Sequence, residues 1–245
     1  IFNGPSTNRV SLAASFTHIA SGDSFTLVTN HFKSKGPSGL SDTSDITFDQ
    51  ADGAGFWNQR RLDAAVAVEA WLQTYPTGLI DDDMIILGDL NAYAMEEPVQ
   101  YLLGQGFNNV ENVEAYSFVF DGQVGTLDYV LLSDSLMAKF AGASLWNVNS
   151  DEADALDYNL DFGRSAEYFN TNTATRNSDH DPLTVGLNLL PAELSIADVL
   201  TNFNNAIEAG EIEGHGDTAF SRGFRLDYFG GLLENAMNFS SNGDD

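Results

Sequence analysis

Short hydrophobic runs, some of them alternating with polar positions, recur through the first 190 residues of the chain. The run at residues 84–87 is continuously apolar and contains β-branched side chains, which is typical of a buried strand. The runs at residues 10–16 and 25–32 flank a Ser-Gly-Asp turn and predict a β-hairpin. Further strands are predicted at residues 116–120, 126–132, 144–149 and 183–187. An Asp-Gly turn separates the first two of these, so we expect them to form a second hairpin.

Helical spacing of apolar positions marks four other stretches. Residues 57–75 carry a wide apolar face, and residues 96–104 begin with two glutamates and a proline, which suit the first turn of a helix. After position 190 the pattern changes, and two more helices are predicted at residues 196–209 and 220–239. We therefore expect a domain of residues 1–190, a helical extension of residues 191–239 and a disordered tail of residues 240–245.

Composition narrows the functional classes. The formal net charge is −26, so the surface repels nucleic acid and anionic membranes unless cations or a local basic patch intervene. Such a charge suits a secreted or salt-adapted protein and attracts divalent cations. The chain has no cysteine, which excludes disulfides, zinc–thiolate sites and a cysteine nucleophile. No apolar run has the length of a membrane span.

Polar side chains stand where several predicted strands end. Asp89 and Asn91 follow the buried strand, and on extended backbone residues i and i+2 face the same side. A carboxylate is a hard oxygen ligand for Mg²⁺, Mn²⁺ or Ca²⁺, and an amide can hold a phosphate oxygen. An Asx-rich turn is the alternative interpretation of this pair. The other strand-end residues are Asn30, His31, Asp128, Asp179 and His180.

A histidine beside aspartates can act as a general base on water, while asparagine and histidine side chains can donate to an oxyanion. Together with a carboxylate-bound metal, these groups suffice for metal-assisted phosphodiester hydrolysis.

Two loops carry concentrated charge. Lys33 and Lys35 follow the second strand and predict a phosphate site, with a solvated turn as the alternative. Arg60 and Arg61 lie in the first turns of the 57–75 helix, where the dipole does not favour cations, which indicates an anionic ligand or a salt bridge. Aspartates recur every three or four residues in the 37–56 loop, which could bind Ca²⁺ or be merely flexible.

Four segments, in this order along the chain, resemble motifs of the endonuclease/exonuclease/phosphatase superfamily, which has the DNase I-like fold. They are Asn-His-Phe-Lys-Ser-Lys-Gly at 30–36, Gly-Asp-Leu-Asn-Ala-Tyr at 88–93, Leu-Asp-Tyr at 127–129 and Ser-Asp-His-Asp-Pro at 178–182. The resemblance covers residues 9–190 and is nearest to the large extracellular bacterial nucleases of that superfamily.

The resemblance implies a role for each matching residue. His180 would be the general base, oriented by Asp128, and His31 would bind the scissile phosphate. The metal, the attacking water and the phosphate would be held by Asp89 and Asn91, with Asp179 beside them. The remaining contacts to phosphate would come from Arg9, Asn30, Lys33, Lys35 and Arg61.

The resemblance also implies an α+β fold that forms part of a four-layer α/β sandwich. Its N-terminal half, with an early Asn and a metal-binding Glu, has no counterpart in these residues. A single sheet would expose an apolar inner face, so we expect the missing half to precede Ile1, in the same chain or as a separate one. Alone, the 245 residues are expected to be inactive.

The predicted function is therefore metal-dependent hydrolysis of DNA, and also of RNA, with Mg²⁺ or Mn²⁺ and a structural Ca²⁺. The alternatives are another phosphoesterase of the superfamily, acting on phospholipid or inositol phosphate, and a non-catalytic surface protein that retains the scaffold. The resemblance implies a secreted or cell-surface protein of a Gram-negative bacterium.

Overall fold

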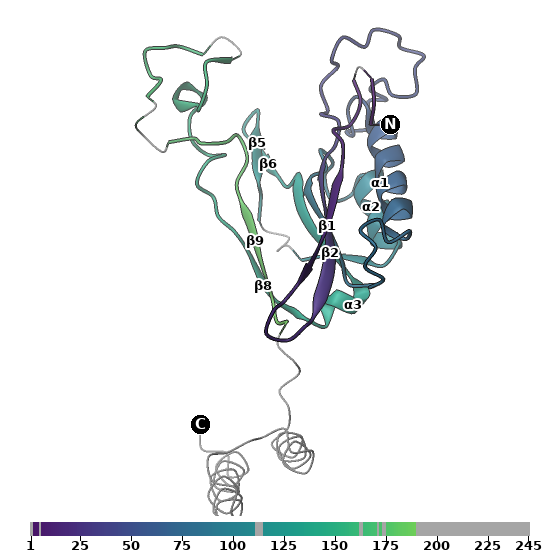
Figure 1. Cartoon of the computed structure of the whole chain (residues 1–245). Helices are drawn as coiled ribbons and strands as arrows, with labels where there is room; N and C mark the ends of the chain where they lie inside the picture. The colour runs from purple at the N-terminus through teal and green to yellow at the C-terminus, as the bar shows by residue number, and fades with distance from the viewer. Residues whose placement is uncertain are drawn as a thin grey trace, which may run out of the picture. The chain divides into compact units, whose positions relative to one another are not determined.

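A computed structural model describes residues 2–4, 6–110, 115–161, 164–170, 172 and 175–189. The predicted helical extension and tail, residues 191–245, lie outside the described residues. Residues 1–189 form one compact unit. Its mixed sheets and few helices make an α+β fold, as predicted (Figure 1).

The main sheet has five strands in the order β1-β2-β3-β7-β4. Their bounds are β1 Leu12–Thr17, β2 Ser24–His31, β3 Met84–Asp89, β7 Asp128–Ser133 and β4 Phe107–Asn109. The predicted first hairpin is confirmed, because β1 pairs antiparallel with β2. Parallel pairing of β2 with β3 sets His31 opposite Asp89, and antiparallel pairing of β3 with β7 sets Asp89 opposite Asp128.

One face of this sheet is covered by α1 (Asn58–Leu72) and α2 (Glu97–Gly104), which lie along the same side of the strands (Figure 1). The core there joins Val28 and Ile86 of the sheet to Val68 and Leu72 of α1, all at most 1% exposed. Burial of each such side chain contributes about 1.5–3 kcal/mol. These two helices match the predicted ones to within a few residues at each end.

The other face is covered less completely. A small buried cluster lies there, formed by Ile85 of β3, Leu132 of β7 and Leu136 of the short helix α3 (Asp134–Met137). Phe140 and Leu187 pack against this cluster from a separate two-stranded ladder of β8 (Phe140–Leu145) and β9 (Leu183–Leu187). On β1, at the sheet edge, Leu12 and Phe16 remain 68% and 48% exposed. These exposed apolar side chains are consistent with the expectation of a second sheet packed against this face. That second sheet stays a prediction.

The predicted second hairpin is wrong in its pairing. The expected partner of residues 116–120 was 126–132, but β5 (Phe118–Phe120) pairs with β6 (Gln123–Gly125). Asp121 and Gly122 both have positive φ, 50° and 73°, which closes the hairpin within two residues. The segment that begins at Asp128 is thereby released to enter the main sheet as β7.

The strand predicted at 144–149 ends at Leu145. Beyond it, the backbone N–H groups of residues 148–150 donate to the side chain of Asp181 and are not available to a strand partner. The described residues between 151 and 169 are irregular, as expected, apart from the 3₁₀ turn η1 (Asp154–Leu156).

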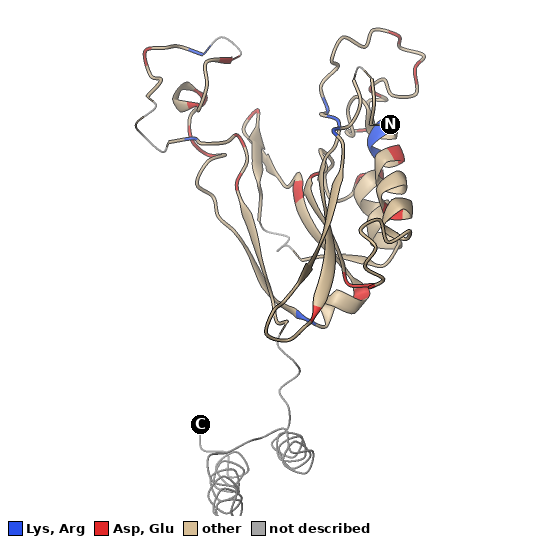
Figure 2. Ribbon diagram, viewed as in Figure 1, with Lys and Arg blue, Asp and Glu red and all other residues tan. Residues whose placement is uncertain are grey.

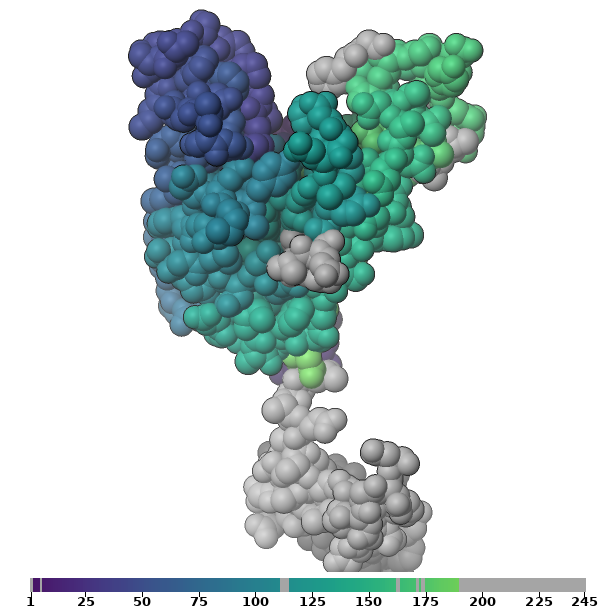
Figure 3. Space-filling view, turned by 180° about the vertical axis from the view of Figure 1, so that it is seen from behind, coloured from purple at the N-terminus to yellow at the C-terminus, as the bar shows by residue number. Residues whose placement is uncertain are grey.

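Two long loops project at the end of the main sheet where β2 terminates. Figure 1 shows the 33–57 loop and the 150–176 loop at this end, and Figure 3 shows the same two projections from behind, with the β5–β6 hairpin between them. Among the described residues, no helix combines the length and apolar character needed to cross a membrane.

Candidate active site

The sheet register and the approach to β9 bring three ionisable side chains together. Asp89 ends β3, Asp128 begins β7, and His180 forms an isolated bridge with Phe118 just before β9. One ligand atom from each of Asp89, Asp128 and His180 lies within 4.8 Å of the other two. Sequence reasoning predicted all three residues, from distant parts of the chain, as members of one site.

The histidine is held by Asp128. Nδ1 of His180 lies 2.5 Å from Oδ2 of Asp128, and that same oxygen accepts the hydroxyl of Ser117 at 2.6 Å. Burial by itself lowers the pKa of His180, but the hydrogen bond and charge of Asp128, with the charges of Asp89 and Asp179, raise the pKa above its ordinary value. The proton on Nδ1 is therefore fixed toward Asp128, which leaves Nε2 for a substrate or water.

Ser117 was missed by sequence reasoning. It is fully buried, and its hydroxyl oxygen accepts the backbone N–H groups of Leu127 and Asp128 at 3.1 and 3.2 Å while its proton goes to Asp128. These bonds fix the carboxylate that orients the base. A lone serine inside an aromatic strand gives no periodic signal, so only the fold exposes this role.

Asp89 and Asn91 meet through an Asx turn and not along extended backbone, which corrects the premise of their prediction. Asn91 has φ 48°, and its backbone N–H donates to Oδ1 of Asp89 at 2.7 Å. Its side-chain amide donates to Oδ2 of Asp89 at 2.8 Å and to the Phe32 carbonyl at 3.0 Å. Asn91 thus positions Asp89 through two hydrogen bonds, and its amide nitrogen is the atom that lies beside the carboxylate.

Asp89 is the most electrostatically perturbed group of the site. Burial, followed by the nearby negative charge of Asp128, raises its pKa to about 6. Its position depends on Gly88, which has φ 121°. A Cβ at position 88 would lie 2.0 Å from the carbonyl oxygen of Asn30, so only glycine fits between the strands.

His31 ends β2 beside Asp89, with Nε2 3.6 Å from Oδ2 of that carboxylate. Burial lowers the pKa of His31, and the positive charges of Arg9 and His180 lower it further. The imidazole is therefore neutral near pH 7, and it can hydrogen-bond to a phosphate. Arg9 joins the same end of the sheet, because its backbone N–H donates to the His31 carbonyl at 3.1 Å.

Asn30 does not donate into the site, which corrects its prediction as an oxyanion donor. Its side chain lies on the helix-covered face of the sheet, where Nδ2 donates to the carbonyls of Val28 at 3.2 Å and Leu87 at 3.3 Å. Its oxygen accepts from Ser11 at 2.7 Å. It fastens β2 to its two neighbours in the sheet.

Arg61 is also not a phosphate contact. Its side chain is fully buried, and the guanidinium donates to the carbonyls of Lys33, Phe56 and Ala54 at 2.7–3.1 Å. It therefore anchors the 33–57 loop to α1. A signal was present in the sequence: positions 61, 65, 68 and 72 share one helical face, and all four are buried.

The two lysines of this loop differ. Lys35 forms an ion pair with Glu96 and donates to the Ala54 carbonyl at 2.7 Å, so its predicted phosphate contact competes with a structural role. Lys33 donates to Ser34 and Ser38 and lies 5.6 Å from the centre of the Trp57 ring. Figure 2 shows basic positions gathered at this end of the sheet.

Asp179, predicted as a metal ligand, lies outside the group of three ligand atoms. Its charge still reaches the site, because it acts on the pKa values of His31, Asp89 and His180. The structure thus replaces Asp179 with Asp128 as the second carboxylate nearest Asp89.

The acidic loop predicted to bind Ca²⁺ is built from local turns. The carboxylates of Asp42, Asp45, Asp49 and Asp52 each accept a backbone N–H two residues further on. Within the described part of the chain, only the group around Asp89 brings three potential metal-binding side chains together. The Ca²⁺ expectation stays a prediction.

No protein-family profile matches this chain, and no curated protein matches it. Similar solved structures include an endonuclease/exonuclease/phosphatase family protein of Bacteroides thetaiotaomicron, at 14% identity and a TM-score of 0.46 over 72% of this chain and 55% of that one. A mannosyl-6-phosphatase of the same species matches at 14% identity and 0.46, over 72% and 56%. The human Nocturnin catalytic domain matches at 19% and 0.36, over 55% and 42%.

The superfamily named by the first of these structures is the one that the four sequence motifs resemble. The chain spans about half the length of the solved structures it matches. At these TM-scores the likeness carries no conclusion about the activity of this chain.

Proposed function

We propose that this chain carries the catalytic histidine and the metal-binding carboxylates of a phosphodiesterase that cleaves nucleic acid. The observation that supports the proposal is the set of Asp128, His180 and Asp89, in which an oriented imidazole stands next to a largely buried carboxylate. A base within reach of a metal-binding acid is what hydrolysis of a phosphodiester by water requires.

The donor set fits a divalent cation. Two carboxylates face each other on paired strands, and burial together with the negative charge of Asp128 raises the pKa of Asp89 to about 6. Hard oxygen ligands of this kind suit Mg²⁺ or Mn²⁺, which would be held by Asp89 with the amide oxygen of Asn91 and Asp128 or Asp179 nearby. Such an ion would make water more acidic and would offset charge on the phosphate.

The chain's own residues then divide the work. His180 accepts a proton at Nε2, and Asp128 stabilises the imidazolium that results. His31, neutral at pH 7, donates to a non-bridging phosphate oxygen. Arg9 and Lys33 supply positive charge at the same end of the sheet, where an anionic strand would lie against an otherwise acidic protein.

A second sheet would complete the site. His31, Asp89 and Asp128 lie in register at one end of the main sheet. On the face of the sheet away from α1 and α2, Leu12 and Phe16 of β1 are exposed. The family resemblance implies a complementary half of the domain, with a further metal-binding Glu, that would cover this face. We therefore propose that cleavage needs that half, and that the protein acts outside the cell or at its surface.

Two other functions remain to be separated from this one. A phosphoesterase that acts on lipid or inositol phosphates would share the same catalytic group but would not depend on a basic track for a polymer. A non-catalytic surface protein would explain the charge of −26, but it would have no use for an oriented His180–Asp128 pair.

The test is cleavage of supercoiled plasmid by the chain, alone and with the complementary half supplied, in Mg²⁺ or Mn²⁺ and in EDTA. We expect nicking that requires the metal and weakens as monovalent salt rises. Activity that survives chelation would refute the metal mechanism. Hydrolysis of phosphomonoesters or phospholipid without plasmid nicking would identify the alternative substrate class.

A further inference from the structure

The residue after the proposed base makes an unusually complete set of hydrogen bonds. The Asp181 side chain belongs to a residue that is 3% exposed, and its Oδ1 accepts the backbone N–H groups of Val148, Asn149 and Ser150 at 2.9, 2.8 and 3.1 Å. Its Oδ2 accepts the amide of Asn147 at 2.9 Å and the hydroxyl of Ser150. One carboxylate thus holds four consecutive residues of the loop after β8.

Three successive N–H groups that converge on one oxygen form a backbone cradle for an anion. Here the anion is internal. Burial acts to raise the pKa of Asp181, but hydrogen bonds from Ser150, Asn149 and Asn147 outweigh it and hold the pKa below its ordinary value. The carboxylate is therefore charged at neutral pH, and the cradle is permanently filled.

The loop held in this way returns to the proposed base. The Asn149 side chain donates to the backbone carbonyl of His180 at 3.1 Å and accepts the backbone N–H of Asn177 at 3.2 Å. On the other side, the backbone N–H of Asp181 donates to the carbonyl of Ser117 at 2.8 Å. Ser117 is also the residue whose hydroxyl fixes Asp128.

The geometry points to Asp181 as a positioning residue: we propose that its carboxylate, by filling the cradle of residues 147–150, fixes the backbone that directs Nδ1 of His180 onto Asp128. This inference rests on the proposed function only in taking His180 as the general base. A purely structural Asp181 would stabilise the loop without controlling the orientation of the imidazole, so the two roles can be separated by observing the ring itself.

The experiment compares the full chain with Asp181→Asn by NMR. The chain has four histidines, so long-range ¹H–¹⁵N spectra resolve the ring of each, and His180→Gln assigns the signal of interest. Asparagine keeps the size of the side chain but removes its charge. It also replaces one accepting oxygen with an NH₂ group, which faces the donors Asn147 and Ser150.

At a pH where the imidazole of His180 is neutral, we expect it to hold a single tautomer protonated on Nδ1 in the natural chain and to show mixed tautomers in Asp181→Asn. Amide exchange at residues 148–150 should accelerate at least tenfold, while exchange in β2 and β3 stays unchanged. The matched control is Asp83→Asn, which removes a buried carboxylate at the opposite end of the same sheet and should leave both signals intact.

Faster loop exchange with an unchanged His180 ring would overturn the proposal and leave Asp181 a structural residue. If Asp181→Asn does not fold, Asn149→Ala decides, because it removes the bond to the His180 carbonyl and leaves the backbone cradle in place. An unchanged ring in that variant would also refute the inference. None of these measurements depends on catalysis, so failure to nick plasmid would count against the proposed function alone.

Discussion

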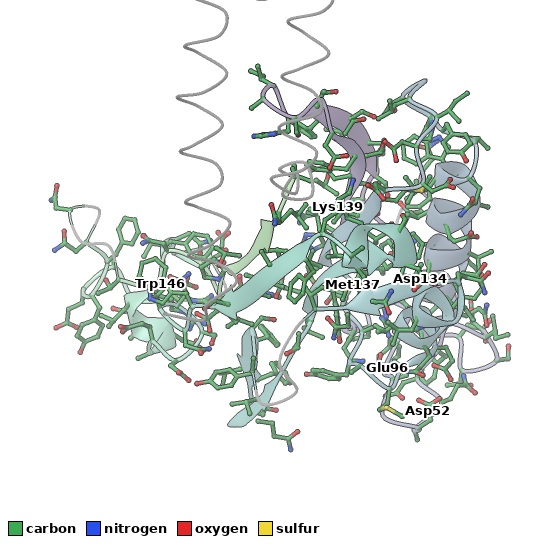
Figure 4. The ribbon with its side chains drawn as sticks, turned by 90° about the horizontal axis from the view of Figure 1, so that it is seen from below. Asp52, Glu96, Asp134, Met137, Lys139 and Trp146 are labelled. Atoms are coloured by element: carbon green, nitrogen blue, oxygen red, sulfur yellow. The ribbon has the colours of Figure 1, made fainter. Side chains whose placement is uncertain are left out.

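The two ends of the main sheet both carry buried or half-buried aspartates, but they treat these charges in opposite ways. Before β2 and β3, Asp23 and Asp83 each lie 2.6 Å from Nζ of Lys139, which follows α3 (Figure 4). After the same two strands, Asp89 faces Asp128, and the basic groups beside it are the imidazoles of His31 and His180.

The difference shows which end stabilises the fold and which is prepared for a ligand. Lys139 donates hydrogen bonds to the carboxylates of Asp23 and Asp83, which raise its pKa, so the charges at that end are mutually satisfied. At the other end the pKa of Asp89 is raised to about 6. Ionisation of this carboxylate at pH 7 therefore lowers the free energy of unfolding. An unneutralised buried charge is most easily explained by a cation or a substrate that binds there.

The largest expected difference between the ends concerns catalysis. His180→Ala should reduce metal-dependent nicking by about 10²–10⁴-fold, since it removes the general base. His18→Ala is the matched control, because His18 lies in the β1–β2 turn at the opposite end of the sheet, and the described hydrogen bonds of its ring go to Ser21 within the same turn. Rates are measured with the complementary half present, and equal loss in both variants would contradict the assignment.

Metal binding should separate the ends next. Asp89→Asn is expected to weaken Mn²⁺ binding at least about tenfold, which titration calorimetry can measure on the chain. Asp83→Asn removes an equally buried carboxylate that already has a lysine partner, and it should leave the affinity unchanged. Equal weakening by both substitutions would indicate non-specific attraction to the acidic surface.

Stability without metal should move in the other direction at the site. Asp89→Asn is expected to raise the free energy of unfolding at pH 7 by about 1–3 kcal/mol, because it removes a largely buried negative charge that faces Asp128. The folded pKa of about 6 exceeds the unfolded value of about 4, so the natural chain loses stability as pH rises from 4 to 6 and no further above it. Urea unfolding at pH 4.5 and pH 7 should show this decrease in the natural chain and a smaller one in the variant.

The smallest effect is expected at the paired end. Lys139→Met should lower the free energy of unfolding by about 1–2 kcal/mol, because two partly buried carboxylates lose their donor. Plasmid nicking and Mn²⁺ binding should be unchanged. A stabilising effect of this substitution in urea unfolding would show that the two ends do not differ as described.

The strands and the reactive residues were accessible from sequence, because apolar runs fix the strands and the polar residues at their ends stand out against them. The 84–87 run predicted β3 nearly to the residue, and Asp89 followed directly. The apolar run at residues 126–132 likewise placed Asp128 on a strand. A carboxylate in such a run needs a partner, which marked Asp128 as a candidate site residue.

The supporting contacts were not accessible, because each depends on residues that are distant in the chain. The hydroxyl of Ser117 reaches His180 through Asp128, and Asp181 finds its donors 31–34 positions earlier. Arg61 was assigned to phosphate because of its charge, although its helical position indicated burial. Charge alone does not distinguish a ligand contact from a buried guanidinium that is held by backbone carbonyl groups and by an ion pair with Glu96.

Gly88 gives the fold a position with no mutational tolerance. A methyl group there would collide with the Asn30 carbonyl, so even alanine would force β2 and β3 apart at the point where His31 and Asp89 are presented. In a saturation library, this glycine should score like a catalytic residue although it has no functional group. The core positions of β2 and β3 can accept several apolar residues, whereas position 88, near the end of β3, accepts only glycine.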